Sequence, residues 1–278
     1  MPRRYLMCRP SYFAVDYAIN PWMDPSAPVH VDRAIAQWET LRETYRDLGH
    51  AVEEIDPVPG LPDMVFAANG ATVIDGTALG VAFRYAERAA EAPAYLDWFD
   101  RHGFATEEAK ATNEGEGDML LTRDFLLAGT GFRTEIAAHA EAQELFGRPV
   151  ISLRLVDPRF YHLDTALTVL DPDGSRDGRP EIAYLPEAFS PGSRAVLERL
   201  FPDAIRARME DAVVLGLNAT ADGRHVVMPV QATALAKQYA AAGYEPIGVD
   251  VSELLKAGGG PKCCTLVIRT ADTTEQEV

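Results

Sequence analysis

The chain has 278 residues, 47% of them hydrophobic, which supports one large domain or two small ones with a buried core. Its formal net charge of −16, with no basic stripe to offset it, excludes nucleic acid as the expected partner, whereas a cationic small molecule would be attracted. No run of about 18 apolar residues is present, so no membrane span is expected.

The cysteines and the first residues bear on location. Three cysteines, two of them adjacent, cannot make a disulfide framework and indicate a reducing compartment. The N-terminal stretch MPRRYLMCRP lacks the apolar run of a signal peptide. We therefore expect a cytoplasmic protein without membrane contact, and we leave open whether it is a homo-oligomer.

Five amphipathic stretches have the apolar spacing of helices, and four of them precede a clear extended run. In chain order the expected helices cover residues 31–49, 86–102, 134–145, 191–200 and 232–242. The extended runs are AVEEIDPV, FATEEAK, PVISLRL and YEPIGVDV, and the weaker AIRARME follows the fourth helix.

Pairs of strands joined by turns lie between these units. The turns fall at Asp75-Gly76, near Arg123-Asp124, in a Gly/Pro/Asp-rich loop after TALTVL, and at Asp222-Gly223. A fifth pair would join the two chain ends, RYLMCRP and CTLVIRT. Hairpin, helix and strand thus recur at ~45–55 residue intervals, which favours units closing into a ring. An α/β sandwich with mixed strands is the alternative, because the units share negligible sequence identity.

A histidine and a carboxylate stand two residues apart in YHLDTALTVL. We expect His162 and Asp164 at the head of a strand, where this spacing places both on one face. A histidine beside a carboxylate is held in one orientation and becomes a better base. The alternative is a histidine in a surface loop.

Three carboxylates crowd into ATNEGEGDML, at Glu114, Glu116 and Asp118. They repel one another unless a cation lies among them, and a metal, a guanidinium or an ammonium would serve. The intervening glycines let the backbone approach a ligand closely. A solvated acidic turn is the alternative.

Polar residues also interrupt two apolar regions. Asp63 and Asn69 flank an expected strand in GLPDMVFAANGATV, with a bulge re-aiming a side chain near Asn69. Arg84 and Arg133 each follow a phenylalanine near the close of a hairpin. Each guanidinium could bind a carboxylate in a bidentate manner, or could be an ordinary surface arginine.

The stretch GGGPKCCTLVIRT joins a glycine-rich loop to two thiols. A nucleophilic thiol needs access, and its acid/base partner can be a histidine far away in sequence. Strand alternation would place Cys263 and Cys264 on opposite faces, so only one should face a site. Adjacent cysteines lack the spacing of a zinc site, and we expect no metal.

Taken together, several stretches between residues 9 and 268 resemble one family. They are PDMVF, the glutamate-glycine-aspartate loop, FRT, the His-x-Asp pair and GGG-x-x-C-x-T. The chain resembles the guanidino-modifying enzymes of the pentein fold: arginine deiminases, dimethylarginine dimethylaminohydrolases, amidinotransferases and arginine dihydrolases. The resemblance implies a five-bladed pseudosymmetric α/β propeller of ββαβ units, as one domain over 1–271 with a C-terminal tail over 272–278.

The resemblance also implies roles for the conspicuous residues. The family's nucleophile stands two residues before a threonine, which here is Thr265, and this selects Cys263. His162 would be the general acid/base, and Asp164 a carboxylate that binds substrate.

Further residues follow from the same resemblance. Glu114 would be the second catalytic carboxylate, but the loop has one residue more than the family's Glu-Gly-Gly-Asp, so Glu116 stays open. Asp63 matches a guanidinium-binding aspartate. Arg84 and Arg133 match residues that hold the amino-acid end of the substrate.

One departure concerns specificity. Dimethylarginine hydrolases of the family often read Phe-x-Glu-Asp where this chain reads FAAN, so Phe66 is kept and Asn69 replaces a carboxylate. An asparagine there is similar to the arginine dihydrolases, which release ornithine. A carboxylate favours a cationic guanidinium, whereas an amide can bind a neutral ureido group as well. We expect no ornithine cyclodeaminase domain after the cysteine strand.

The resemblance therefore predicts a cysteine-dependent hydrolase of a small cationic amino acid, working through a covalent thiouronium without metal or cofactor. The favoured reaction converts arginine to ornithine, ammonia and carbon dioxide. A dimethylarginine hydrolase or a deiminase would stop at citrulline, and an amidinotransferase would pass the amidino group to another amine. A non-catalytic binder of cationic amino acids is the alternative from another class.

Overall fold

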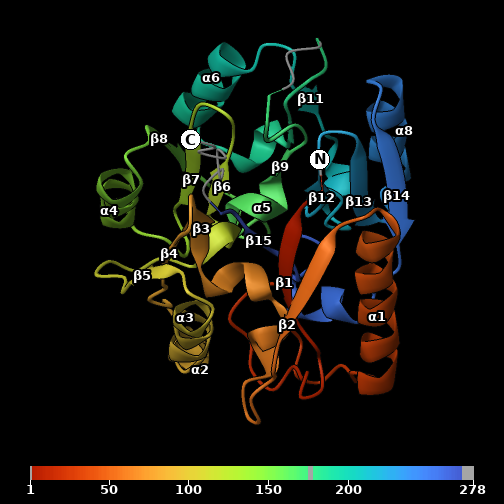
Figure 1. Ribbon diagram of the computed structural model, residues 1–278. Coiled ribbons are helices and arrows are strands. Elements are labelled where there is room, and N and C mark those ends of the chain that lie inside the picture. Colours follow the sequence, from red (N-terminus) through yellow and green to blue (C-terminus); the bar gives the residue numbers. More distant parts are fainter. Residues whose placement is uncertain (1, 175–177, 271–278) are drawn as a thin grey trace, which may run out of the picture.

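The computed structural model describes residues 2–174 and 178–270 (Figure 1). The expected tail at 272–278, and part of the loop within the third predicted hairpin, lie outside these ranges. Among the helices in the described ranges, none has the length and apolar character needed to cross a membrane.

Five small sheets with one shared topology make up the fold. In each, an antiparallel pair is followed by a third strand that runs parallel to the second. Four sheets use consecutive strands: β3 (Thr72–Ile74), β4 (Thr77–Leu79) and β5 (Ala105–Glu107); β6 (Met119–Leu121), β7 (Leu126–Thr130) and β8 (Val150–Arg154); β9 (Leu167–Val169), β10 (Ile182–Tyr184) and β11 (Ile205–Arg206); β12 (Thr220–Ala221), β13 (His225–Pro229) and β14 (Glu245–Val249).

The remaining sheet joins the two ends of the chain. It contains β15 (Leu266–Ile268), β1 (Arg4–Cys8) and β2 (Ala51–Ile55), in that order. β1 pairs with β15 in the antiparallel sense and with β2 in the parallel sense. The fifth predicted hairpin is thereby confirmed, and the ring is closed by its own termini.

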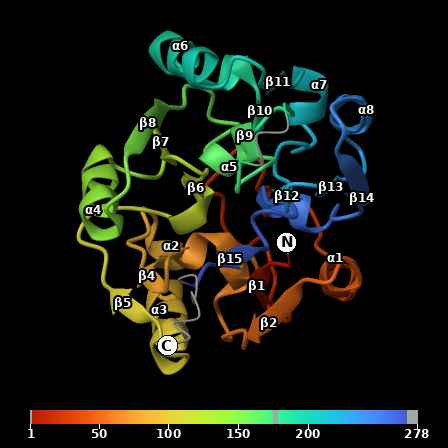
Figure 2. The ribbon, with the colours of Figure 1, turned by 45° about the horizontal axis from the view of Figure 1, so that its top comes forward.

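Each parallel connection carries a helix, as a crossover between parallel strands requires. We call a sheet together with this helix a blade. The crossover helices are α1 (Val31–Asp47), the pair α2 (Ala86–Ala89) and α3 (Glu91–Arg101), α4 (Ile136–Phe146), α6 (Pro191–Leu200) and α8 (Thr233–Ala241). Figure 2 shows α1, α3, α4, α6 and α8 around the rim with the sheets inside them. The predicted five-bladed pentein propeller is confirmed.

One predicted helix is divided. The expected helix over 86–102 breaks at Ala90, which separates α2 from α3. Pro93, in the first turn of α3, has no backbone N–H to donate back to the carbonyl of Ala89, so one continuous helix cannot form.

Short helical segments replace strands at the ends of the blades. They are η1 (Pro62–Val65), η2 (Ala67–Gly70), η3 (Gly115–Gly117), η4 (Pro186–Ala188), η5 (Leu254–Ala257), α5 (Leu163–Ala166) and α7 (Met209–Ala212). Three strand predictions are therefore wrong. The stretch from Asp63 to Asn69 forms two 3-10 turns, His162 caps α5, and Cys263 lies in a turn before β15.

The turns form because their backbone hydrogen bonds are local. Phe66 N donates to Asp63 O at 2.9 Å, and Asn69 N donates to Phe66 O at 3.0 Å. One further hydrogen bond links this stretch to the C-terminal part of the chain: Ala68 N donates to Cys263 O at 3.0 Å. The apolar side chains of this stretch are buried without any sheet, which is why its pattern resembled a strand.

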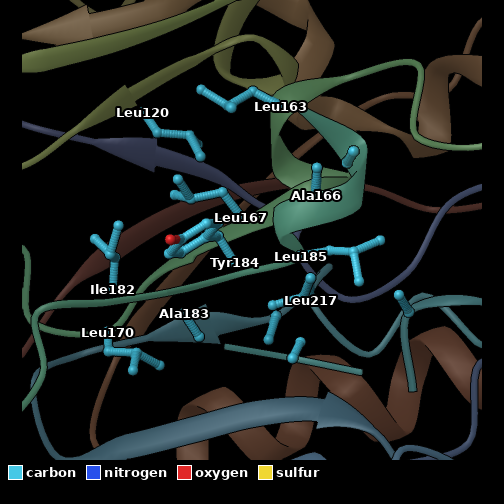
Figure 3. Packing of buried hydrophobic residues seen from close by; sticks show 14 of the residues in the cluster. Leu120, Leu163, Ala166, Leu167, Leu170, Ile182, Ala183, Tyr184, Leu185 and Leu217 are labelled. Carbon is cyan, nitrogen blue, oxygen red and sulfur yellow. The ribbon is translucent and has the colours of Figure 1, made fainter. Parts of the chain in front are cut away.

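The largest cluster of buried apolar side chains anchors α5. Leu163 and Ala166 of this helix pack in it near Leu167 and Tyr184 of the adjoining sheet (Figure 3). The helix is thus fixed by its apolar residues. His162 before it and Asp164 in its first turn belong to the site described below.

Candidate active site

Cys263 contacts a carboxylate and an amide. Its Sγ lies 3.2 Å from Asp164 Oδ2 and 3.0 Å from Asn218 Nδ2. The cysteine is 2% exposed and the aspartate 0%. Burial raises the pKa of this thiol most, and the charge of Asp164 raises it further. The thiolate therefore depends on donors or a positive charge reaching the sulfur.

His162 pairs with Glu114 in the interior. His162 Nε2 lies 2.7 Å from Glu114 Oε2, and the same oxygen accepts from Arg133 Nη1 at 2.8 Å. Burial alone would raise the pKa of Glu114, but the hydrogen bond with His162 and the charge of Arg133 outweigh it and lower that pKa. The ionised carboxylate holds the imidazole in one orientation.

A third group surrounds Asp63. Tyr17 Oη donates to Asp63 Oδ2 at 2.9 Å, and Arg88 Nε lies 3.9 Å from that oxygen. Arg88 Nη1 donates to Asn69 Oδ1 at 2.8 Å. Asn69 Nδ2 in turn donates to Glu114 O at 3.1 Å, which links this group to the histidine pair.

Four buried carboxylate oxygens lack hydrogen-bond partners within the described ranges: Asp63 Oδ1, Asp118 Oδ2 and Asp164 Oδ1, and, in α7, Asp211 Oδ2. Burial is the largest cause that raises the pKa of Asp118 and of Asp164, each to about 6. Unpaired buried acceptors are costly, so a ligand rich in N–H donors would stabilise them. No group of three or more His, Cys, Asp or Glu arranged to hold a metal occurs in residues 2–174 and 178–270.

The two glutamates of the carboxylate loop face different partners. Glu116 Oε2 accepts from Lys262 Nζ at 2.8 Å and from Val267 N at 3.0 Å, and Oε1 accepts from Arg269 Nη1. Glu116 is 1% exposed. Of the two candidates for the second carboxylate, Glu114 contacts His162 and Glu116 fastens the terminal strand to the carboxylate loop.

Two glycines permit close approach of these segments. A Cβ on Gly117 would lie 2.3 Å from Asn69 Nδ2 and 3.2 Å from the His162 ring. A Cβ on Gly259 would lie 2.1 Å from Phe66 Cε1. Phe66, 4% exposed, thus packs directly against the glycine-rich loop that precedes Cys263.

The two predicted carboxylate-binding arginines differ in position. Arg133 is 3% exposed and contacts Glu114. Its Cζ lies 4.7 Å from the ring centroid of Tyr85 and 4.6 Å from that of Tyr161. Arg84 has an exposed side chain, and only its backbone N reaches the site, at 3.2 Å from Glu114 Oε1. The Arg84 guanidinium is not brought together with the other predicted residues.

The adjacent cysteines also differ, although not through strand alternation. Cys264 is 0% exposed and packs in the apolar cluster, and burial raises the pKa of its thiol. Only Cys263 has hydrogen bonds to polar side chains at the site. The direction of each thiol comes from the turn in which both lie.

The segment between β1 and α1 closes over the site. Besides the Tyr17 contact, Ile19 O accepts from Arg133 Nη2 at 2.9 Å. Asn20 Nδ2 donates to Ala257 O at 3.0 Å, and Trp22 Nε1 donates to a backbone carbonyl at 2.8 Å. These contacts hold the segment against Asp63, Arg133 and the end of η5.

Sequence reasoning missed several residues of the site, namely Tyr17, Arg88, Tyr161, Asn218 and Lys262. Arg88 lies within the second expected helix and was given no role, yet it is 3% exposed and pairs with Glu91 at 2.7 Å. Asn218 stands in an unremarkable apolar run, LGLNAT, and carried no signal. Lys262 could have been noticed only as the neighbour of the nucleophile.

Glu116→Gln should lower the free energy of unfolding by about 3 kcal/mol, because Lys262 and Arg269 lose their buried counter-charge. Glu245→Gln is the matched control, since its pair with Arg224 is exposed and should contribute less than about 1 kcal/mol. Urea unfolding followed by circular dichroism measures both. Equal, small losses would contradict the fastening role of Glu116.

No family model matches the chain. A dimethylarginine dimethylaminohydrolase from Mycobacterium tuberculosis is 54% identical over 266 residues, which cover 96% of this chain and 86% of that protein. The bifunctional arginine dihydrolase/ornithine cyclodeaminase ArgZ from Synechocystis is 36% identical over 272 residues, and the chain spans only 37% of its length.

Among solved structures, the N-terminal domain of ArgZ has been determined as an asparagine-to-serine mutant covalently bound to a reaction intermediate. It superposes with a TM-score of 0.91 at 35% identity, covering 96% of this chain and 98% of that one. Fold, site and relatives agree: the chain belongs to the pentein family of guanidino-modifying hydrolases, together with dimethylarginine dimethylaminohydrolase and the arginine dihydrolase domain.

Proposed function

We propose that this protein is an arginine dihydrolase that uses Cys263 as its nucleophile and releases ornithine, ammonia and carbon dioxide. The observation that carries the proposal is the buried thiol beside Asp164 of α5, together with His162, which precedes the same helix and pairs with Glu114 of the carboxylate loop. Binding alone requires no thiol, which argues against a silent binder of cationic amino acids.

The free carboxylate oxygens fit a guanidinium. A guanidinium presents five N–H donors in one plane, and Asp63 Oδ1 and Asp164 Oδ1 are buried acceptors without partners in the described part of the chain. The ligand's positive charge beside Sγ would favour the thiolate that burial and Asp164 disfavour. Substrate binding would thereby activate its own nucleophile.

In the first half of the reaction, the Cys263 thiolate attacks the guanidinium carbon and forms a C–S bond. The bond from that carbon to a terminal nitrogen breaks, and His162 donates a proton so that ammonia departs. The product is a covalent S-alkylthiouronium, whose positive charge the ionised Glu114 and Asp164 stabilise.

In the second half, His162 accepts a proton from water, and the resulting hydroxide attacks the same carbon. The C–S bond breaks, the hydroxyl group on that carbon loses its proton to solvent, and the thiolate and citrulline form. A second round on the bound ureido group consumes another water and gives ornithine, ammonia and carbon dioxide.

The amino-acid end of the substrate requires a different set of groups. We assign its carboxylate to Arg133, whose guanidinium is held in place by two tyrosine rings. Arg84 is the second predicted partner, and its exposed side chain would have to turn inward to reach a bound substrate.

Asn69 supports release of ornithine rather than citrulline. Its amide is neutral, and it is oriented by Arg88 on one side and the Glu114 carbonyl on the other. A neutral amide at this position does not reject citrulline after the first round, so the second can proceed. Dimethylarginine hydrolysis ending at citrulline is the second candidate, favoured by the relative that is 54% identical.

The three cysteines are free and buried. This supports the proposal of a cytoplasmic enzyme, where thiols are kept reduced.

Incubation with arginine should give ornithine and two ammonia per arginine, and chromatography with an ammonia assay measures both products. Citrulline as the end product from arginine would identify a deiminase. Turnover of asymmetric dimethylarginine with release of dimethylamine, and none of arginine, would identify the second candidate instead. An amidino group recovered on an added amine would identify a transferase.

Cys263→Ser should lower kcat by at least about 10³-fold and abolish the covalent adduct seen by intact-protein mass spectrometry, because a serine hydroxyl is a far weaker nucleophile here. Cys264→Ser is the matched control and should retain activity close to the unmodified protein. The assignment fails if both replacements reduce activity equally.

Asn69→Asp should shift the product from ornithine toward citrulline by about tenfold, because a carboxylate favours the cationic guanidinium over the neutral ureido group. The ratio of the two products is the measurement, since it does not depend on how much total activity is lost. An unchanged ornithine yield would remove the specificity role given to Asn69.

A further inference from the structure

Asn218 is fully buried, and its side chain forms hydrogen bonds with Cys263, with the glycine-rich loop before it and with the backbone of Asp164. It lies between α7 and β12, in a different blade from the terminal strand, and is 0% exposed. Its Oδ1 accepts from Cys263 N and from Gly260 N, each at 3.0 Å. Its Nδ2 lies 3.0 Å from Cys263 Sγ and donates to Asp164 O at 3.2 Å.

The orientation of this amide follows from its neighbours. Backbone N–H groups can only donate, so the side-chain atom facing Gly260 N and Cys263 N must be the oxygen. The carbonyl of Asp164 can only accept, so the atom facing it must be the nitrogen. The NH₂ group is therefore directed at Sγ, and a flipped amide would lose three hydrogen bonds.

The geometry points to Asn218 as a further catalytic residue, one that stabilises the Cys263 thiolate through the Nδ2–H to Sγ hydrogen bond. This rests on the proposed role of Cys263 as nucleophile. The same amide also fixes the position of that cysteine, because its oxygen holds the backbone of the nucleophile turn.

The other groups at the sulfur explain why this donor matters. Burial and the charge of Asp164 both raise the pKa of the Cys263 thiol, whereas a backbone hydrogen bond from Gly260 lowers it. The nearby Lys262 ammonium is occupied by Glu116 and by the carbonyl of Thr265. In the described ranges Asn218 supplies the side-chain N–H that contacts Sγ. Without a substrate, it is the polar side chain placed to favour the thiolate.

The backbone conformation before Asn218 supports a specific placement of its side chain. Leu215 adopts a φ of 54°, a conformation that residues with a side chain rarely take, and it is 0% exposed. Asn218 N donates to Leu215 O at 2.9 Å, so this turn orients the asparagine. Lys262 N donates to Asn218 O at 3.3 Å, which adds a backbone link to the nucleophile turn.

The test measures the apparent pKa of the Cys263 thiol directly, without any substrate. The rate of alkylation by iodoacetamide is followed from pH 6 to 10, with peptide mass spectrometry to assign modification to Cys263 rather than to its neighbour. Asn218→Ala removes both functions of the amide. Asn218→Asp is nearly isosteric and keeps an oxygen for the two backbone N–H groups, but places an acidic oxygen beside Sγ.

We expect Asn218→Ala to raise the apparent pKa of alkylation by about one unit and to slow alkylation about tenfold at a pH below that pKa. Asn218→Asp should raise it further, because a second carboxylate joins Asp164 at the sulfur. In the turnover assay both variants should lose kcat, with the rising limb of the pH profile moved to higher pH.

Asn113→Ala serves as the control for loss of a buried amide, because Asn113 is 0% exposed and bonds only backbone groups away from the sulfur. Its alkylation pKa should equal that of the unmodified protein. An unchanged pKa in Asn218→Asp, in protein with native circular dichroism, overturns the proposal even if kcat falls, since a purely positioning residue would behave so. Where Asn218→Ala does not fold, Asn218→Asp decides alone. Failure to hydrolyse guanidino compounds would refute the proposed function and leave this thiol measurement intact.

Discussion

The rest of the structure depends on the antiparallel pairing of β1 with β15, residues 4–6 against residues 266–268. This contact closes the ring, because each of the other four blades is built from consecutive segments. It also places Cys263, just before β15, beside Asp164 and Asn218 of other blades. Glu116 reinforces the closure from the carboxylate loop by binding Val267 N, Lys262 and Arg269. The same strand pairing thus closes the ring and brings the residues of the site together.

Charge matching is the second constraint. The site buries Asp63, Glu114, Glu116 and Asp164 together with Arg88, Arg133 and Lys262. Buried side chains stay charged in a low-dielectric interior only when they are paired or hydrogen-bonded. Most charged atoms of these residues have such a partner. Of the carboxylates just named, Asp63 and Asp164 each keep one oxygen without a partner in the described ranges, and a cationic ligand adds the most stabilisation there. The same pairing separates the two loop glutamates: Glu114 serves the histidine, and Glu116 serves the chain terminus.

The sequence predicted site residues best where reactive residue types stand at a characteristic spacing. His162 and Asp164 were grouped on the premise of a shared strand face. The premise was wrong: both stand at the start of α5, where His162 contacts Glu114 and Asp164 contacts Cys263. Cys263 was separated from Cys264 in the same way, with a turn in place of the expected alternation. Arg88 and Asn218 escaped notice because a helix position and an apolar run do not reveal which side chains are enclosed. Arg84, which the family pattern highlighted, has its guanidinium at the surface.

By itself the sequence determined the repeated hairpin, helix and strand, since apolar periodicity and turn residues act over a few positions. With the family motifs, it also determined the reactive residue types and the order in which they occur. Only the tertiary structure decided which glutamate meets His162, which arginines are buried, and that an asparagine from a distant blade contacts the nucleophile. The reason is physical: the contact of Glu114 with His162 joins residues 48 positions apart, that of Asn218 with Cys263 joins residues 45 positions apart, and both contacts join different parts of the ring.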